Sequence, residues 1–307
     1  MSSVKNYLVS ALVTTYNSER YMRGLLEDLE AQTIADQLEI VIVDSNSPQN
    51  EGAIIGEYQK RYDNIVYLRT EDRESSHAAW NRCIHLARGK YLTIACTDDR
   101  HRPDALELMV RVLEEYPEYG LVYADSLITT VENETFEQNS ATKRYDWPDY
   151  NLGTALSSCI FGPQPVWRRD VHEKAGYFNP SIWIAGDHDL FIRIAWRCGA
   201  VHLRETLGLF LKRDDSNSGR NNREEAIRDA LQVLRFYREQ IPIADIYSEL
   251  QSNQDDPCAM AAALWHFGNL CALSPYNDFE LAMKQYQLVF KLKGLPSEYV
   301  QKLKIMF

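Results

Sequence analysis

Two adjacent carboxylates, Asp98 and Asp99, follow directly on a short apolar run at 91–96. The run is rich in aromatic and β-branched residues, which is typical of a central parallel strand covered on both faces. In open α/β sheets, ligands bind beyond the carboxyl ends of the strands. Paired carboxylates at such an end favour binding of Mg²⁺ or Mn²⁺, which prefer oxygen ligands. The alternative for this stretch alone is a polar loop with a helix-capping Asp.

Other acidic residues follow predicted strands or begin a predicted helix. Asp44 ends the apolar run 38–43, and Asp125 ends the run 120–124. Acidic ends of parallel strands would face one crevice. Asp187 stands where the amphipathic pattern of 186–199 begins, and there the helix dipole and free N–H groups favour a carboxylate. From this stretch alone, a helix N-cap is the simplest interpretation of Asp187.

These residues must be positioned by alternating strands and helices. Strands that alternate with helices of about 10–15 residues predict βαβ units and a largely parallel sheet. Residues 131–178 have a weaker pattern, which predicts loops and short strands. After a polar linker at 214–223, the pattern is helical to the end. The predicted strands are 7–13, 38–43, 65–68, 91–96 and 120–124, and the predicted C-terminal helices are 224–240, 243–250, 260–273, 279–292 and 298–306.

The composition is that of an ordinary globular protein. The 307 residues are enough for one large domain or one with a smaller companion, and the net charge of -11 argues against general nucleic-acid binding. No stretch approaches the roughly 20 apolar residues that span a bilayer. Residues 1–6 lack the cationic and apolar segments of a secretory signal. We therefore expect a cytoplasmic protein whose six cysteines are reduced.

Several motifs, taken in order, resemble those of family 2 glycosyltransferases, the inverting enzymes of the GT-A fold. The similarity covers about residues 7–215, and Thr97-Asp98-Asp99 is closest to the form found in the spore-coat polysaccharide branch. The chain departs from the family at Cys83, where glycine is usual, and at Cys96, where an acid or Asn is usual. The matching segments are Thr14-Thr15-Tyr16-Asn17, Ile42-Val43-Asp44-Ser45-Asn46-Ser47, Ala79-Trp80-Asn81-Arg82-Cys83-Ile84, Ala87-Arg88-Gly89-Lys90-Tyr91, Thr97-Asp98-Asp99, Gly176-Tyr177-Phe178 and Gly186-Asp187-His188-Asp189-Leu190.

The resemblance implies a fold and a division of the chain. Residues 1–220 would form the GT-A domain, a Rossmann-like, mostly parallel mixed sheet flanked by helices. Its nucleotide-binding half would end at about residue 125, and its acceptor-binding half would span 126–220. Residues 221–307 would form an all-helical C-terminal domain.

The resemblance also implies roles for single residues. Thr15, Tyr16 and Asp44 match positions that hold the nucleotide base, with the Tyr ring stacking and the Asp accepting from the base edge. Asp98 matches a ribose contact. Asp99 matches the ligand of a divalent metal, Mn²⁺ or Mg²⁺.

Further roles concern the reaction itself. Asp187 matches the general base. Arg73 and Asn81 are further candidates for nucleotide binding, with a solvated surface arginine as the alternative for Arg73. Many members have a metal-binding His past the last sheet strand, and this chain has Asp214 and Asp215 near that place.

The implied activity is metal-dependent, single-displacement transfer of a sugar in polysaccharide biosynthesis. The donor would be a nucleotide-diphosphate sugar, with UDP favoured, and the acceptor a hydroxyl of a carbohydrate, a lipid-linked or another molecule. Further options are a homo-oligomer and peripheral contact of the C-terminal helices with the inner membrane face. The lysines that would make this contact are Lys284, Lys291, Lys293, Lys302 and Lys304.

Three other functions are weighed against this one. The main alternative is a non-catalytic GT-A-like protein that binds a nucleotide or glycan and docks a partner through its helical tail, because of Cys83, Cys96 and the missing His. A nucleotidyltransferase would carry a glycine-rich basic loop after the first strand, and residues 14–20 contain no glycine. A dinucleotide dehydrogenase would need a GxGxxG segment after a strand, which the chain lacks.

Overall fold

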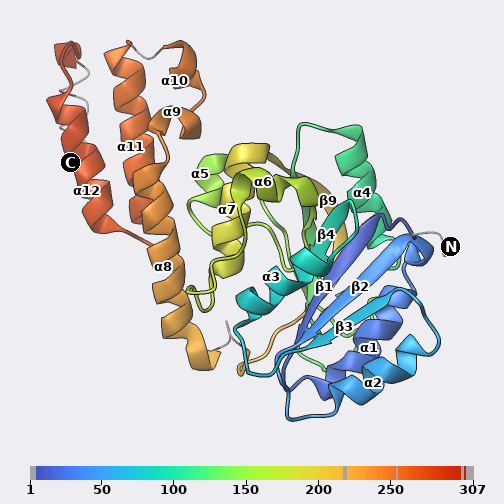
Figure 1. The fold of residues 1–307 in the computed structure, drawn as a ribbon. Coiled ribbons are helices and arrows are strands. Elements are labelled where there is room, and N and C mark those ends of the chain that lie inside the picture. Colours follow the sequence, from blue (N-terminus) through green and yellow to red (C-terminus); the bar gives the residue numbers. More distant parts are fainter. Residues whose placement is uncertain (1–4, 217–219, 254, 299–300, 302–307) are drawn as a thin grey trace. The chain divides into compact units, whose positions relative to one another are not determined.

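The computed structural model describes residues 5–216, 220–253, 255–298 and 301 (Figure 1). The chain forms two compact units. The first, here called the sheet unit, comprises Met1–Asp149 and Ile160–Ala226, and the second, the helical unit, comprises Tyr150–Cys159 and Ile227–Phe307. The helical unit thus includes a short segment, Tyr150–Cys159, that lies in the sequence between two parts of the sheet unit. Lys302, Lys304 and most of the helix expected at 298–306 lie outside the described residues.

Strands and helices alternate through the first part of the sheet unit, as the sequence predicts. Its helices are α1 (Glu19–Glu30), α2 (Glu51–Gln59), α3 (Ser76–Leu86), α4 (Ala105–Glu115), α6 (His172–Ala175) and α7 (Gly186–Cys198). Its strands are β1 (Val9–Thr15), β2 (Leu38–Asp44), β3 (Ile65–Arg69), β4 (Tyr91–Ile94), β5 (Arg100–His101), β6 (Leu121–Thr129), β7 (Lys143–Tyr145), β8 (Val166–Arg168) and β9 (Ala200–Leu211).

The strands form one mixed sheet in the order β3-β2-β1-β4-β8-β6-β9-β5, with β7 paired to β6. The pairs β1–β2, β1–β4 and β2–β3 are parallel, and so is the pair β6–β9. β8 runs antiparallel to both β4 and β6, so those two strands point the same way. The carboxyl ends of β1, β2 and β4 therefore lie at one edge of the sheet. The register places Thr15 directly beside Asp44 at that edge.

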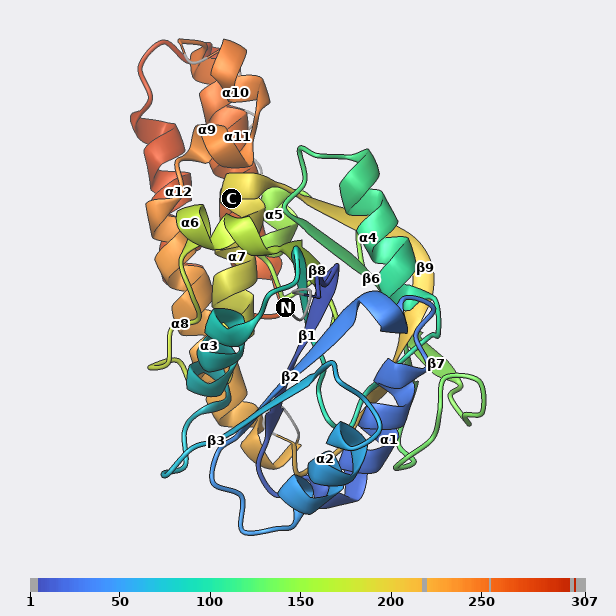
Figure 2. The same ribbon diagram turned by 45° about the vertical axis from the view of Figure 1, so that its right-hand side comes forward.

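Helices cover both faces of the sheet (Figures 1 and 2). Alternate residues of β1, such as Val9, Ala11 and Val13, share one core with buried side chains of α1, α2 and α4. The opposite face receives α3, where the Cys83 thiol donates to the Val13 carbonyl. Strands that are apolar on both faces suit this double cover. The α/β class and the helical C-terminal part predicted from the sequence are confirmed.

Two strand predictions are corrected by the structure. β6 does not end at Asp125 but continues to Thr129. Oδ1 of Asp125 accepts from the backbone N–H of Trp147 and lies 2.9 Å from Nε2 of His202 on β9. The carboxylate therefore makes its contacts within the sheet unit. β9 itself is missing from the predicted strands. Its middle is polar and only partly buried, and a β-bulge beside Asp125 breaks the alternating pattern.

The helical unit consists of α5 (Leu152–Ala155), α8 (Arg223–Gln240, which begins in the sheet unit), α9 (Ile243–Ile246), α10 (Glu249–Ser252), α11 (Pro257–Leu273) and α12 (Phe279–Lys291). The single helix expected at 243–250 is wrong, because Tyr247 takes a non-helical conformation (φ -121°, ψ 91°) between α9 and α10. No helix in the described part of the chain has the length and apolar character needed to cross a membrane.

Arg238 of α8 joins the 150–159 segment to the rest of the helical unit. Its buried guanidinium donates to the Leu156 carbonyl (2.9 Å), the Tyr276 carbonyl (3.0 Å) and the Ser274 hydroxyl (2.9 Å). Burial lowers the pKa of Arg238 from its ordinary value. Hydrogen bonds from a charged donor are the stronger kind, so this side chain fixes α5 against the long helices.

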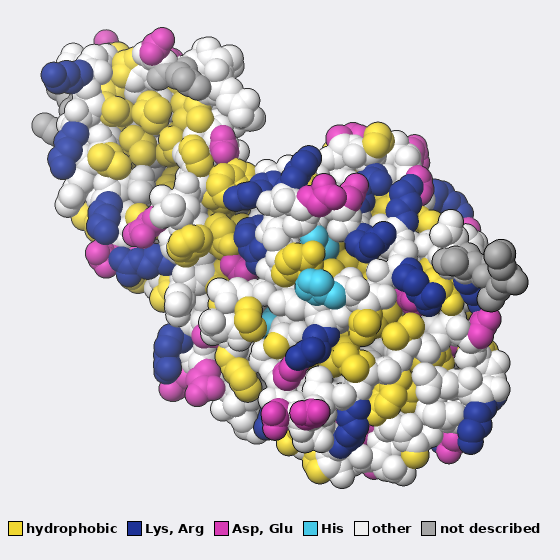
Figure 3. All heavy atoms as spheres, viewed as in Figure 1, with side chains coloured by type: hydrophobic (Ala, Val, Ile, Leu, Met, Phe, Trp, Pro, Cys, Tyr) yellow, Lys and Arg dark blue, Asp and Glu magenta, His cyan; other side chains and the backbone are white. Residues whose placement is uncertain are grey.

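The face of the helical unit seen in Figure 3 carries an apolar patch bordered by charged side chains. Several large side chains of α8, α11 and α12 are exposed, with Leu273 at 82% and Phe279 at 63%. The expected cationic flank is partly neutralised, because Lys284 pairs with Glu280 at 3.2 Å. Membrane contact through these helices stays a prediction.

Candidate functional site

Asp187, distant in sequence, joins the adjacent pair Asp98 and Asp99 around Cys96, just past β4. Burial and the negative charges of Asp99, Asp98 and Asp187 raise the pKa of the Cys96 thiol well above its usual range. The three acids must therefore lie close enough to act electrostatically on one side chain. The thiol stays protonated and adds no further charge. The Asp pair and the start of α7 thus lie near the same thiol.

Asp99 is the more buried member of the pair, with only 2% of its surface exposed. Its Oδ1 accepts from the Leu211 N–H at 3.0 Å. Burial and the neighbouring charge of Asp98 raise the pKa of the Asp99 carboxyl well above its usual range. A nearby divalent cation would favour the ionised form, so the chemistry of this carboxyl fits a metal ligand.

Asp99 is not part of a complete metal-binding cluster of side chains among the described residues. Within the described ranges, no group of three or more His, Cys, Asp or Glu side chains is arranged to hold a metal ion. Mg²⁺ commonly binds through one or two carboxylates together with the phosphates of a substrate. The donor set therefore fits a cation that arrives with a phosphorylated ligand.

Asp98 is paired with a cation that the sequence motifs did not reveal. Arg213, two residues after β9, donates to Asp98 Oδ2 from Nη2 at 2.8 Å and from Nε at 3.2 Å. The same guanidinium donates to Asp215 at 3.0 Å. Asp215, expected near a metal, is thus engaged with Arg213. One guanidinium between two carboxylates leaves the local charge negative, which favours a cation here.

Arg100 shapes the turn that carries the Asp pair. Its guanidinium is buried and donates from Nη1 to the carbonyls of Thr97 (2.9 Å) and Asp99 (2.6 Å). Gly24 makes room for it, since an added Cβ would lie 2.5 Å from Nη2 of Arg100. Burial lowers the pKa of Arg100 from its ordinary value. The sequence pattern does not reveal this role, because nothing in it shows where an arginine folds back.

Asp44 lies fully buried at the end of β2 and organises the loop that follows. Its Oδ1 accepts from the Ser47 N–H at 2.7 Å. Its Oδ2 accepts from the Tyr67 hydroxyl at 2.8 Å and from Arg69 at 2.7 Å. Burial and the bond to Asp44 raise the pKa of Tyr67 to about 12. Thr15 borders the same loop, because its carbonyl accepts from the Ser45 N–H at 3.0 Å, and its hydroxyl lies 3.4 Å from Glu51 of α2.

Tyr16 and Arg73, both expected to contact a nucleotide, lie together. The guanidinium carbon of Arg73 stands 4.1 Å from the centroid of the Tyr16 ring, which is a cation–π contact. Tyr16 is half-buried and Arg73 is exposed. A planar ligand could replace or extend this stack.

Asn81 serves a contact inside the protein. Its amide Nδ2 donates to the Phe178 carbonyl and its Oδ1 accepts from the Phe178 N–H, both at 2.9 Å. Both polar groups of the side chain are therefore used to hold the 176–178 segment against α3. No arrangement of Asn81 toward a nucleotide is visible among the described residues.

Asp187 lies in the first turn of α7, after the N-cap residue Ala185, so the N-cap interpretation is wrong. Its Oδ1 accepts from the His188 N–H at 2.8 Å. Its Oδ2 has no hydrogen-bond partner in the part of the chain that the structure describes. A half-buried carboxylate with one anchored and one open oxygen can accept a proton from a bound molecule.

The start of α7 packs tightly against α3. Gly186 lies against the buried ring of His77, and the rings of Trp80 and Phe178 stand 5.5 and 5.8 Å from that ring. This aromatic cluster links the 176–178 segment to the helix that carries Asp187. It thereby fixes where the carboxylate lies.

Comparison with known proteins identifies related sequences. Residues 10–173 match the profile described as Glycosyl transferase family 2. An uncharacterised glycosyltransferase of Methanocaldococcus jannaschii is 30% identical over 187 residues, which are 61% of this chain and 64% of the relative. The chondroitin synthase of Escherichia coli is 27% identical over 188 residues, 61% of this chain and 26% of the relative. The chain spans less than two thirds of the length of either.

Solved structures share the fold. TarS of S. aureus in complex with UDP has a TM-score of 0.60 at 17% identity, with 91% of this chain and 87% of that chain covered. The mannosyltransferase PcManGT of Pyrobaculum calidifontis, in complex with GDP-Man and Mn²⁺, has a TM-score of 0.62 at 16% identity, with coverages of 97% and 79%. These neighbours are GT-A glycosyltransferases, and the predicted GT-A fold is confirmed. At such identities the likeness concerns the fold alone.

Substitution of Gly186 by Ala tests the packing that positions Asp187. A Cβ there would lie 2.6–2.8 Å from three atoms of the His77 ring, so the ring or the helix must shift. We expect Gly186→Ala to lower the free energy of unfolding by about 1–3 kcal/mol in urea denaturation. The matched control is Gly56→Ala in α2, where an added Cβ meets nothing within 4 Å. This control should raise the free energy of unfolding by about 0.5–1 kcal/mol. Equal effects of the two substitutions would contradict the tight packing.

Proposed function

The chain belongs to the family 2 glycosyltransferases, and we propose that it transfers a sugar from a nucleotide-diphosphate sugar to an acceptor hydroxyl with inversion. The observation that carries the proposal is the gathering of Asp98, Asp99 and Asp187 around Cys96 at the sheet edge where Asp44 also lies. Donor binding, leaving-group departure and proton removal each need one polar group at this place. The form Thr97-Asp98-Asp99 keeps its predicted likeness to the spore-coat branch.

The donor nucleotide would bind at the ends of β1 and β2. The base would stack on Tyr16, in the place of or beside the Arg73 guanidinium, and its edge would reach the loop ordered by Asp44. Asp98 would contact the ribose. UDP is favoured because it is common in the family, and a solved neighbour is named as a complex with UDP. Thr15, beside Asp44 in the register, would border the base.

The diphosphate would lie between Asp99 and Arg213. Asp99 would hold Mn²⁺ or Mg²⁺, and the cation, when bound, supplies charge neutralisation for the leaving group. Arg213 lies close enough to lower the cost of ionising Asp99, and it pairs with Asp98. It would add a positive charge that is present at every ordinary pH. The protein thus opposes the charge of the diphosphate with an arginine as well as with the metal site.

Asp187 would act as the general base. Its open Oδ2 would take the proton of the acceptor hydroxyl while the hydroxyl oxygen attacks the anomeric carbon. The new carbon–oxygen bond forms on the face opposite the breaking bond to the diphosphate, whose oxygen leaves with the electron pair. One displacement of this kind inverts the configuration. The Cys96 thiol, kept protonated, takes no part as a nucleophile.

The acceptor is proposed as a carbohydrate chain in polysaccharide biosynthesis, since one relative is named a chondroitin synthase. The 176–178 segment, the His77 ring and the start of α7 would form the acceptor side. A lipid-linked acceptor, contact with the inner membrane face and a homo-oligomer stay predictions. A non-catalytic binding protein would share the nucleotide contacts but would not turn over a donor.

Replacement of Asp187 by Asn tests the proton transfer and the catalytic function together. We expect release of UDP from a UDP-sugar, with water or an added sugar as acceptor, to fall by about 10²–10⁴-fold. Affinity for the donor, measured by calorimetry, should stay within about twofold, because the amide keeps the bond from the His188 N–H. The control is Asp170→Asn, an exposed acid of the same unit that should leave the rate unchanged. Near-normal turnover of the Asp187 variant would remove it as the base.

Replacement of Asp99 by Asn tests the metal role. The amide oxygen can still accept from the Leu211 N–H, so the turn should stay folded. In the wild-type chain, MnCl₂ should tighten UDP binding by at least about tenfold, or about 1.4 kcal/mol. The Asp99→Asn variant should show no such gain when UDP is titrated with and without MnCl₂. The same Mn²⁺-dependent gain in both proteins would place the metal ligand elsewhere.

A further inference from the structure

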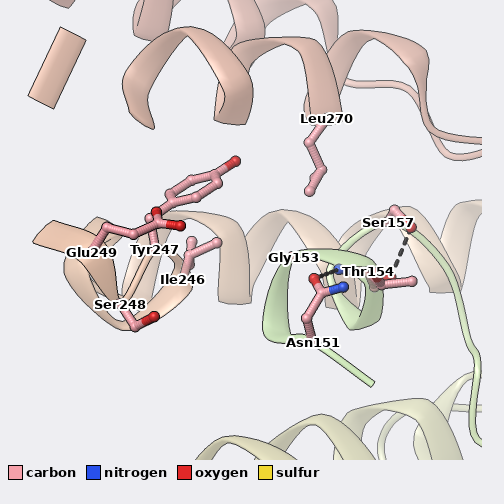
Figure 4. Close-up of a pocket in the computed structure, with 9 residues that line it drawn as sticks. All are labelled: Asn151, Gly153, Thr154, Ser157, Ile246, Tyr247, Ser248, Glu249 and Leu270. Carbon is pink, nitrogen blue, oxygen red and sulfur yellow. Dashed lines mark hydrogen bonds between the residues drawn. The ribbon is translucent and has the colours of Figure 1, made fainter. Parts of the chain in front are cut away.

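The helical unit contains a cavity of about 460 Å³ that takes no part in the site around Cys96. One side is formed by residues 151–157 at α5, and the other by residues 246–249 between α9 and α10, with Leu270 of α11 above them. Figure 4 shows these two sets of side chains facing one another across a gap. Small-molecule sites commonly measure roughly 300–1,000 Å³, so the cavity can accept a ligand of ordinary size.

The walls of this cavity are fixed by backbone geometry and by hydrogen bonds. The break at Tyr247 ends α9 and turns residues 247–249 away from a continuous helix. Arg238 holds the opposite wall through the Leu156 carbonyl. Gly153 lies where the walls approach one another, since an added Cβ would stand 3.2 Å from Asn151 Oδ1 and 3.4 Å from Leu270. A preformed site loses less free energy to ordering when a ligand binds.

Polar groups on both walls have capacity left for a ligand. Asn151 uses its Oδ1 to accept from the Thr154 N–H at 2.8 Å, so its amide N–H groups can donate. The Ser157 hydroxyl donates to the Thr154 carbonyl at 2.7 Å and can still accept. The Glu249 carboxylate is exposed, and no side-chain hydrogen bond to it is formed within the described part of the chain. Hydrogen-bond donors and acceptors thus face the same gap.

The apolar part of the lining is an aromatic ring with two aliphatic side chains. The ring of Tyr247 is half-buried, and Ile246 and Leu270 stand beside it. Burial raises the pKa of Tyr247 to about 12, so its hydroxyl stays protonated and can donate. A tyrosine offers an apolar face and a polar tip, which matches a ligand with one C–H face and a rim of hydroxyls.

The charge of the lining narrows the class of ligand. Among the described residues that form the walls, none is Lys, Arg or His, and Glu249 is the single acid. A phosphate, a nucleotide or an acidic sugar would meet a carboxylate without a counter-charge, which disfavours its burial. A neutral sugar carries hydroxyls for Glu249 and Asn151 and a C–H face for Tyr247.

We propose that this cavity binds a neutral sugar unit of a glycan. The assignment of the glycan as the acceptor chain rests on the proposed transfer function. A second contact in the same polypeptide would keep the acceptor associated between transfers, because linked sites raise the effective concentration of a shared ligand. The sheet unit would then add sugars to a glycan that is already bound to the helical unit.

The test uses the full chain on an array of neutral, N-acetylated and acidic oligosaccharides, followed by calorimetry with the neutral oligosaccharide that binds best. Glu249→Gln removes the charged acceptor from an exposed position. Asn151→Asp keeps the bond from the Thr154 N–H but replaces the amide donor. Each should weaken binding by at least about tenfold. The control, Asp255→Asn, removes the charge of an exposed acid outside the cavity and should bind as the wild type does.

Three outcomes would overturn the proposal: no neutral oligosaccharide binds, only acidic ones bind, or both cavity variants bind as tightly as the wild type. Thermal unfolding of each variant identifies any loss that comes from misfolding, and the two chemically different variants must agree. Mn²⁺-dependent UDP binding, measured on the same samples, should be equal in all four proteins. If the wild type does not bind UDP, the proposed transfer function is contradicted. The glycan measurement reports on the cavity alone.

Discussion

Like charges held close together at the edge of the sheet are the constraint on which the site depends. Two adjacent carboxylates, one of them buried, resist ionisation unless positive charge or hydrogen-bond donors oppose them. The protein opposes them with the Arg213 guanidinium on Asp98 and the Leu211 N–H on Asp99. Both groups come from the end of β9 and the residues that follow it. Pairing of β9 with the rest of the sheet is therefore as important to the site as the strand that carries the acids.

Arg100 supplies hydrogen-bond donors to the backbone of the same turn. The carbonyls of Thr97 and Asp99 would otherwise lie buried near negative charge, and the guanidinium satisfies both. It fits only because α1 has a glycine, Gly24, at the point of contact. Helix α1 thus takes part in shaping the site. A divalent cation, when bound as proposed, would add the charge that the arginines do not supply and would favour ionisation of the buried Asp99.

Strong local patterns made much of this predictable. The apolar runs of β1, β2 and β4 and the periodic helices between them follow from residue types alone, and the motifs around Asp44, Asp99 and Asp187 indicated the sheet edge and the helix start. Weak local patterns hid the rest. β9 is polar in its middle, and its pairing is set by contacts far along the chain. The roles of Arg100 and Arg213 depend on where a long side chain folds back, and that of Asn81 depends on which distant backbone packs against α3; spacing encodes neither. The break at Tyr247 has a different cause: the helical pattern of the sequence continues across the residue, but its backbone is not helical.

The most direct measurement is an anomalous difference map from crystals grown with MnCl₂ and UDP. We predict a manganese peak about 2 Å from an Asp99 carboxylate oxygen, with the diphosphate completing its coordination. The uracil ring should stack on Tyr16, and Asp187 should lie on the side of the diphosphate where a sugar would extend. Manganese or UDP bound away from Asp99 and Tyr16, with this sheet edge empty, would contradict the assignment of the three carboxylates to one nucleotide-sugar site.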